Sequence, residues 1–187
     1  AGLLRSDFQE HSEALFLTSS FVYRDAAEAA RRFANQEPGY LYSRFTNPTV
    51  TMFQDRLAAL EGAEACTATA TGMAAIASTV LGLLKSGDHI VSSRSVFGTV
   101  VPLLDQICKR LGIDTTWVAP SDLDAWQAAV RPNTRLLFCE TPSNPLAEVC
   151  DIAALADIAH RAGAWLAVDN CLLTPALQRP LEHGADL

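Results

Sequence analysis

The sequence contains no apolar run long enough to cross a bilayer. Its longest apolar stretch, residues 74–84, is interrupted by Ser78, Thr79 and Gly82. A membrane-spanning helix needs roughly 20 apolar residues, far more than this stretch supplies. The N-terminus also lacks the basic segment followed by an apolar one that is typical of a secretory signal. We therefore expect a cytoplasmic protein with no membrane partner.

Positive charge is scarce and scattered. The 187 residues include 14 Lys and Arg against 21 Asp and Glu, which gives a net charge of −7. Proteins that bind nucleic acid without sequence preference need clustered cations to neutralise phosphates. We therefore expect no nucleic-acid partner.

The five cysteines include no C-x-x-C pair, and the four histidines lie apart from them in the sequence. Structural zinc sites usually show such pairs, and disulfide frameworks usually have an even number of cysteines. We therefore expect reduced thiols and no metal site. Cys171 lies close to Asp169 but has no histidine base in its own motif, so we expect a pocket-lining or buried thiol rather than a nucleophile.

Segments typical of strands alternate with segments typical of helices from about residue 63 onward. This alternation predicts an α/β fold with a parallel sheet, and several strands are apolar enough to be covered on both faces. The expected strands are residues 65–69, 89–93, 115–118, 136–140 and 165–169.

Two helix starts are recognisable. Asn47 and Pro48 supply a capping residue and a first-turn proline for a helix that runs to about Glu61, where Gly62 can end it. Ser121 and Asp124 resemble a capping box that opens a helix over residues 123–130.

The domain organisation changes near residue 60. Residues 1–60 show no strand–helix repeat and are expected to form an N-terminal arm with the first helix, whereas residues 61–187 read as part of the α/β domain. Leu187 stands at what reads as the entry to a further strand, so we expect a fragment of a longer protein.

One candidate phosphate site lies at Gly72, between an expected strand and an expected helix. Free backbone N–H groups and the positive end of the helix dipole suit an anion there. The sequence has no G-x-G-x-x-G and no G-K-[ST], which disfavours a dinucleotide or a Walker-type triphosphate. A plain tight turn is the alternative.

Two further candidates follow expected strands. Asp169 ends its strand, and the carboxyl ends of parallel strands face the ligand crevice. Asn144 lies between Pro142 and Pro145, which would fix its backbone at the same edge. The alternatives are a turn cap for Asp169 and a rigid polar loop for Asn144.

Three aromatic and basic residues complete the set. Tyr42 and Arg44 could grip a phosphate through the guanidinium fork if their segment is extended, although exposed arm residues often have no role. Phe97 could stack on a flat ligand, or it could belong to the core.

Together and in this order, these segments resemble the cystathionine γ-synthase-like branch of the pyridoxal-phosphate enzymes of cysteine and methionine metabolism. The resemblance implies a fold-type-I large domain of three layers, mainly a parallel sheet with helices on both faces, and pyridoxal 5′-phosphate as cofactor. The matching segments are residues 42–49, 71–74, 97–99, 140–145 and 168–170.

The resemblance implies a phosphate site built by two subunits. Gly72 and Met73 would offer backbone N–H groups, while Tyr42 and Arg44 would reach the same phosphate from a neighbouring subunit. The active site would then be shared within a homotetramer, a dimer of dimers.

The resemblance also assigns the groups around the cofactor ring. Asp169 would pair with the pyridine nitrogen, Asn144 would lie near the 3-hydroxyl, and Phe97 would stack on the ring. Asp169 and Phe97 are the expected catalytic residues.

The family carries a lysine, in a Ser-Ala-Thr-Lys stretch shortly after Gly-Ala-Asp, that binds the cofactor covalently and moves a proton. This sequence ends before it, and Lys85 and Lys109 read as solvated residues at helix ends. The arginine that binds the substrate carboxylate would also lie beyond Leu187. The chain as given is therefore expected to be catalytically silent.

Phe97 stands where many relatives have tyrosine, and residues 92–99 look most like the sulfhydrylases of the family. The implied reaction of the intact protein is γ-replacement on O-succinylhomoserine, an O-acylhomoserine, with sulfide to give homocysteine in methionine biosynthesis. A cystathionine γ-synthase, a cystathionine or methionine β- or γ-lyase, and a non-catalytic module remain as alternatives.

Overall fold

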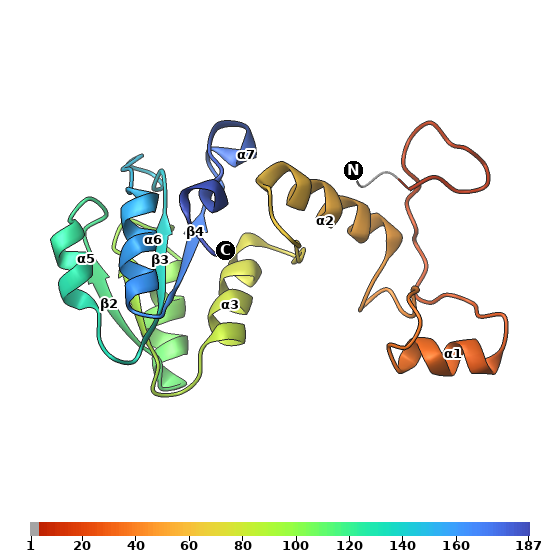
Figure 1. Ribbon diagram of the computed structural model, residues 1–187, viewed down its shortest axis with the longest axis horizontal. Coiled ribbons are helices and arrows are strands. Elements are labelled where there is room, and N and C mark those ends of the chain that lie inside the picture. The colour runs from red at the N-terminus through yellow and green to blue at the C-terminus, as the bar shows by residue number, and fades with distance from the viewer. Residues whose placement is uncertain (1–3) are drawn as a thin grey trace. The chain divides into compact units, whose positions relative to one another are not determined.

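The computed structural model describes residues 4–187 and contains two compact units, one ending at Ala68 and the other beginning at Thr69 (Figure 1). The segment after residue 60 stays with the first unit through a hydrogen bond from the Ala68 N–H to Gln54 Oε1, at 2.8 Å.

The N-terminal unit contains two helices, α1 (Ala26–Phe33) and α2 (Pro48–Glu61). The helix α2 starts as its sequence predicts, with Pro48 in the first turn and the Asn47 side chain accepting the Thr49 N–H. Gly62 ends it in the left-handed conformation, with a φ of 72°, which a residue without a Cβ adopts at no steric cost.

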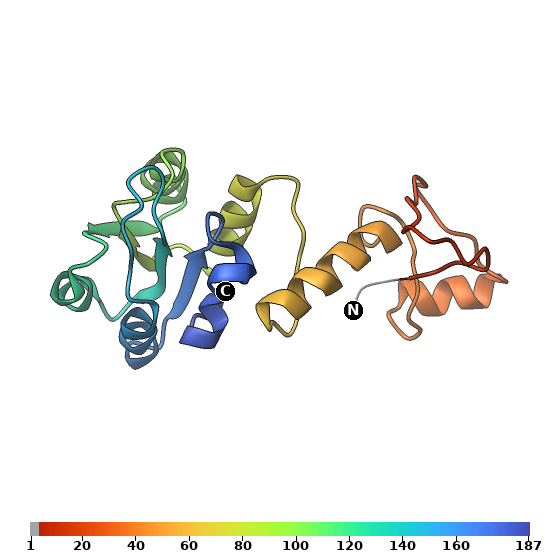
Figure 2. The ribbon, with the colours of Figure 1, turned by 90° about the horizontal axis from the view of Figure 1, so that it is seen from above.

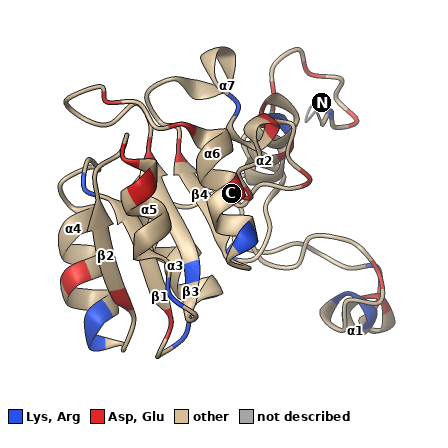
Figure 3. Ribbon diagram, turned by 60° about the vertical axis from the view of Figure 1, so that its left-hand side comes forward, with Lys and Arg blue, Asp and Glu red and all other residues tan. Residues whose placement is uncertain are grey.

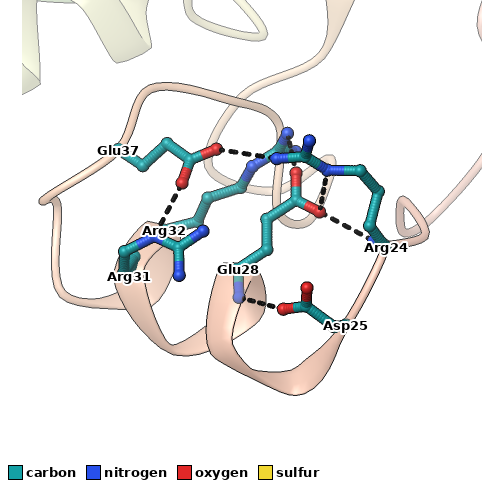
Figure 4. A network of polar contacts seen from close by, with 6 residues as sticks. All are labelled: Arg24, Asp25, Glu28, Arg31, Arg32 and Glu37. Atoms are coloured by element: carbon teal, nitrogen blue, oxygen red, sulfur yellow. Dashed lines mark hydrogen bonds and ion pairs between the residues drawn. The ribbon is translucent and has the colours of Figure 1, made fainter.

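A buried carboxylate organises α1 (Figure 4). The Asp25 side chain caps the helix by accepting the Glu28 N–H at 2.7 Å. Glu28 in turn accepts the Arg24 backbone N–H at 2.7 Å and the Arg32 guanidinium at 2.6 Å. Because Glu28 is only 3% exposed, these charge-assisted hydrogen bonds offset the cost of removing it from water.

The C-terminal unit is built on a four-stranded sheet in the order β2-β1-β3-β4, in which every neighbouring pair is parallel (Figure 2). The strands are β1 (His89–Ser93), β2 (Asp114–Val118), β3 (Thr134–Glu140) and β4 (Trp165–Asp169). The helices are α3 (Gly72–Leu83), α4 (Val100–Pro102), η1 (Leu103–Cys108), α5 (Leu123–Ala129), α6 (Ile152–Arg161), α7 (Thr174–Leu177) and η2 (Pro180–His183).

Two sequence-based expectations about these elements are wrong. Residues 65–69 form no strand; their Thr and Ala residues suit an extended chain, but no sheet neighbour pairs with them. The capping residue of α5 is Asp122, not Ser121, because the Asp122 carboxylate reaches the Ala125 N–H at 2.9 Å.

Alternate residues of the strands point to opposite faces of the sheet. Val91, Leu137 and Leu166 belong to a core with α5 and α6. Their sequence neighbours Ile90, Leu136 and Ala167 belong to a second core with α3, α4 and η1. Each fully buried Leu in these rows stabilises the fold by roughly 2 kcal/mol. The predicted three-layer α/β fold with helices on both faces is confirmed.

The strand order creates a crevice between β1 and β3. The chain leaves β1 through α4 and η1 on one face, and it leaves β3 toward α6 on the other. Since β1 and β3 are neighbours, the loops that follow them separate at their carboxyl ends, which is the usual position of a ligand site in such folds.

Within residues 4–187, no helix combines the length and the apolar character that a membrane span requires.

His89 is a buried titratable group at the opposite end of the sheet. Its ring nitrogens lie 2.8 Å from Thr134 Oγ1 and 2.9 Å from Thr116 Oγ1. Burial, with a smaller effect from Arg131, lowers the pKa of His89 to about 4. The ring is therefore neutral in the folded protein at neutral pH.

The unfolded chain binds a proton at His89 below about pH 6.5, whereas the folded chain does so only near pH 4. We expect this group to lower the free energy of unfolding as the pH falls through that interval, by up to about 3 kcal/mol. Urea unfolding of wild type and His89→Gln across this range measures the effect. The variant should lose less stability on acidification, and parallel pH profiles would contradict the assignment.

Candidate functional site

A cavity of about 200 Å³ lies in the C-terminal unit between α3 and the carboxyl ends of β3 and β4. Gly72 and Ile76 line it from α3, and Phe138, Ala167 and Asp169 line it from the sheet. The walls are mostly apolar, with a carboxylate and a helix start as the polar groups. This composition is typical of a small-molecule site.

The start of α3 can receive an anion. The Thr71 hydroxyl caps the helix by accepting the Ala74 N–H at 3.0 Å, which leaves the Gly72 and Met73 N–H groups without acceptors inside the helix. A Cβ built on Gly72 would meet no atom within 4 Å. The turn is therefore open, and the N–H groups with the helix dipole favour a phosphate there.

Asp169 ends β4 half-buried and lines the cavity. Figure 3 shows the Asp and Glu residues of the chain in red. The Asp169 Oδ1 accepts the Cys171 N–H at 3.0 Å. The turn cap and the ligand role are compatible, because the second carboxylate oxygen can accept a hydrogen bond from a ligand. The cap fixes the orientation of the group that faces the cavity.

Phe97 and Asn144 come from the two loops that flank the crevice. Phe97 follows β1 and is 44% exposed, so it is not a core residue. Asn144 follows β3 and is exposed as well. The backbone N–H of each donates to the carboxylate of Glu140, the last residue of β3.

Glu140, which joins the backbones of Phe97 and Asn144, was not singled out from the sequence. Burial raises the pKa of its carboxyl group, and the charge of Asp169 adds to this increase. The available signal was a charged residue that closes an otherwise apolar strand, next to the Pro-rich loop that contains Asn144.

Tyr42 and Arg44 belong to the N-terminal unit, whereas the other candidate residues belong to the C-terminal unit. Tyr42 forms an antiparallel bridge with Ser20, but a turn follows at once, closed by the Phe45 N–H to the Tyr42 carbonyl at 2.9 Å. The extended segment that the sequence suggested therefore stops at Tyr42. The Arg44 guanidinium carbon lies 5.3 Å from the centre of the Tyr42 ring, a cation–π contact that holds the two side chains together.

The other groups considered from the sequence have simple positions. All five cysteines are free. Cys171 is exposed and does not line the cavity, so the expectation of a pocket-lining or buried thiol is wrong. Lys85 is exposed and follows the C-terminal end of α3, a 12-residue helix about 18 Å long that begins at Gly72, so it lies at the far end from the Gly72 turn. Lys109 is also exposed. Among residues 4–187, no cluster of three or more His, Cys, Asp or Glu side chains could hold a metal ion.

Comparison with known proteins agrees with this geometry. Residues 3–187 match the model of a family described as Cys/Met metabolism PLP-dependent enzyme. The chain belongs to this family. The cofactor of the family is pyridoxal phosphate, as expected from the sequence.

The relatives of this chain include both sulfhydrylases and lyases. The whole chain is 60% identical to an O-succinylhomoserine sulfhydrylase of Pseudomonas aeruginosa and 40% identical to an L-methionine gamma-lyase of Fusobacterium nucleatum, covering 46% and 48% of them. It also superimposes, over its whole length and 46% of the other chain, on a candidate O-acetylhomoserine (thiol)-lyase of Campylobacter jejuni, with a TM-score of 0.95 and 31% identity. That crystal structure contains N′-pyridoxyl-lysine-5′-monophosphate. The chain spans about half the length of the curated relatives it matches.

The residues present fit this cofactor. The open turn at Gly72 offers an anion site, and Asp169 offers a fixed carboxylate on the same cavity. A phosphate and a ring nitrogen are the two polar ends of the cofactor that such groups suit.

We expect Gly72→Ala to separate folding from ligand binding. The added methyl group meets no protein atom, so the free energy of unfolding should stay the same or rise by up to about 1 kcal/mol. The same group takes room at the helix start, so pyridoxal phosphate should bind the intact protein more weakly in equilibrium dialysis.

Gly82→Ala is the matched control, because Gly82 lies on the same helix and also faces open space. It should keep wild-type cofactor affinity. Equal affinities for the two variants would contradict an anion site at Gly72.

Proposed function

We propose that the intact protein containing this chain is a pyridoxal-phosphate-dependent sulfhydrylase. In this reaction the bond between Cγ and oxygen of O-succinylhomoserine breaks, sulfide forms the new bond to Cγ, and succinate leaves with the oxygen. The product is homocysteine, the precursor needed for methionine. The observation that carries the proposal is the meeting of Gly72 and Asp169 on one cavity, in a chain 60% identical to an O-succinylhomoserine sulfhydrylase.

The bound cofactor supplies an electron sink for the charge that develops on the substrate carbons. The N–H groups of Gly72 and Met73 would hold its phosphate, and Asp169 would hold its ring nitrogen in the charged form. Because the Cys171 N–H already fixes one oxygen of Asp169, this carboxylate is oriented before a ligand binds. Asn144 would serve the 3-hydroxyl, and Phe97 would stack on the ring.

The identity of Phe97 favours an acylated substrate over a thioether. A phenyl ring cannot donate a proton to a departing group. A carboxylate such as succinate leaves readily without one, because its conjugate acid has a pKa of about 4, whereas a thiolate is far more basic. A methionine γ-lyase, the second candidate, expels a thiolate and needs an acid from elsewhere.

We propose that the lysine that binds the cofactor comes from the segment following Leu187. The relatives that match are about twice as long as this chain. Leu187 also lies beside β4, where its carbonyl accepts the Val168 N–H at 2.9 Å and its own N–H donates to Leu166 O at 3.2 Å. Residues continuing in this parallel direction would reach the edge that contains Asp169.

The surface of the N-terminal unit supports a shared active site in a homo-oligomer, a dimer of dimers. Phe8, Leu17 and Val22 are each more than 90% exposed within this chain. Apolar side chains of this kind stabilise an assembly when a partner covers them. A neighbouring subunit is the proposed partner, and it receives Tyr42 and Arg44 at its phosphate site.

The free cysteines support the proposal of a cytoplasmic location. All five are unpaired, as expected of a protein kept in a reducing compartment.

The reaction is tested by giving the intact protein O-succinylhomoserine with either sulfide or cysteine. Homocysteine and succinate should form with sulfide, at a rate well above that of cystathionine formation with cysteine. Preference for cysteine would identify a cystathionine γ-synthase. Release of a keto acid without a thiol or thioether product would identify a lyase.

Mixing two impaired variants, each with its defect on a different side of the proposed interface, tests the shared site. Asp169→Asn should keep part of its cofactor but lose at least about a hundredfold in turnover, because ring charge is no longer balanced. Arg44→Ala should weaken phosphate binding. After equal amounts are exchanged, about half of the dimers are mixed, and each mixed dimer contains one intact site of two. About a quarter of wild-type activity should therefore return. No recovery, with exchange verified by mass spectrometry, would contradict the shared site.

A further inference from the structure

Glu140 closes β3 and is only 4% exposed. Its Oε1 accepts the Asn144 N–H at 3.0 Å, and its Oε2 accepts the Phe97 N–H. A single carboxylate thus binds the backbones of two residues that are 47 positions apart in the chain, by the difference of their numbers.

The two residues belong to loops that the topology separates. Phe97 follows β1, from which the chain turns to the α4 face, whereas Asn144 follows β3, from which the chain turns to the α6 face. The distance between these two loops is not set by a direct connection of the chain. Glu140 spans it with two hydrogen bonds, which fixes where both backbones lie.

Burial of this carboxylate is costly for the fold. Glu140 lies opposite Asp169 in the register of β3 and β4, so two like charges are neighbours. Burial and the charge of Asp169 both raise the pKa of Glu140, which shows that its surroundings disfavour the ionised form. An apolar side chain would avoid this cost but could not accept either N–H group.

We propose that Glu140 is a positioning residue that sets the placement of Phe97 and Asn144 around the cofactor, an inference that rests on the proposed function. It acts through the backbone of both residues, and it does not bind the cofactor itself. Loss of one of its two acceptor oxygens should therefore change how the cofactor ring is held.

The test is Glu140→Gln in the intact protein. The amide keeps the size of the side chain but replaces one acceptor oxygen by a donor that faces an N–H group. We expect the dissociation constant for pyridoxal phosphate to rise roughly tenfold, because the loops that contain Phe97 and Asn144 are no longer held in place before the cofactor binds. The circular dichroism of the bound cofactor in the visible range should change, because it reports the environment of the ring.

Glu148→Gln is the matched control. Glu148 joins the same two loops through the Ser95 hydroxyl, at 2.5 Å, but this contact is exposed and does not involve Phe97 or Asn144. Its cofactor affinity and visible circular dichroism should equal those of wild type. Equal changes in both variants would overturn the proposal, because they would reflect general loosening of the loops.

Glu140→Asp serves if the glutamine variant does not fold. It keeps the charge but is one methylene shorter, so it cannot reach both N–H groups, and the circular dichroism should again change. Wild-type affinity and spectrum in the folded Glu140 variant overturn the positioning role while the proposed function stands. A wild-type protein that binds no pyridoxal phosphate overturns both.

Discussion

Parallel pairing of β1, β3 and β4 is the constraint on which the rest of this structure depends. In a parallel sheet all strands point the same way, so the residues that end them gather at one edge. The register places Glu140 opposite Asp169, and both lie two residues beyond core positions on the α3 face, Phe138 and Ala167. The same hydrogen bonds that stabilise the sheet therefore bring the polar groups together beside the start of α3.

This edge combines a rigid scaffold with polar groups that are expensive to bury. The two core layers leave little freedom to the strands, and the acidic side chains stand where the cores end. Glu140 gains two backbone N–H partners and Asp169 gains one, which offsets part of the desolvation cost. The groups are oriented before any ligand arrives, which is the arrangement that favours electrostatic stabilisation of a developing charge.

The N-terminal unit follows a different principle. Its helices are held by caps and by the ion-pair network of Glu28, while many large apolar side chains remain exposed. A partner that covered these side chains would remove them from water and stabilise the assembly. This property agrees with the proposal that Tyr42 and Arg44 serve a neighbouring subunit.

The sequence by itself determined the elements whose signals are local. The β4 strand, the cap and end of α2, and the α/β alternation follow from side-chain pattern and backbone preference within a few residues. Gly72 and Asp169 could be selected in the same way, because each stands at the end of an element. Residues 65–69 show the limit, since a suitable composition forms a strand only where another strand offers it hydrogen bonds.

Only the tertiary structure decided which groups meet. Glu140 looked like the last residue of a strand, and its contact with Phe97 across the crevice depends on the strand order, which no local pattern encodes. The turn after Tyr42 and the cap at Asp122 are local by contrast, because each is closed by a hydrogen bond between residues three apart. Local preferences act between residues near in sequence, whereas a binding site is made by residues near in space.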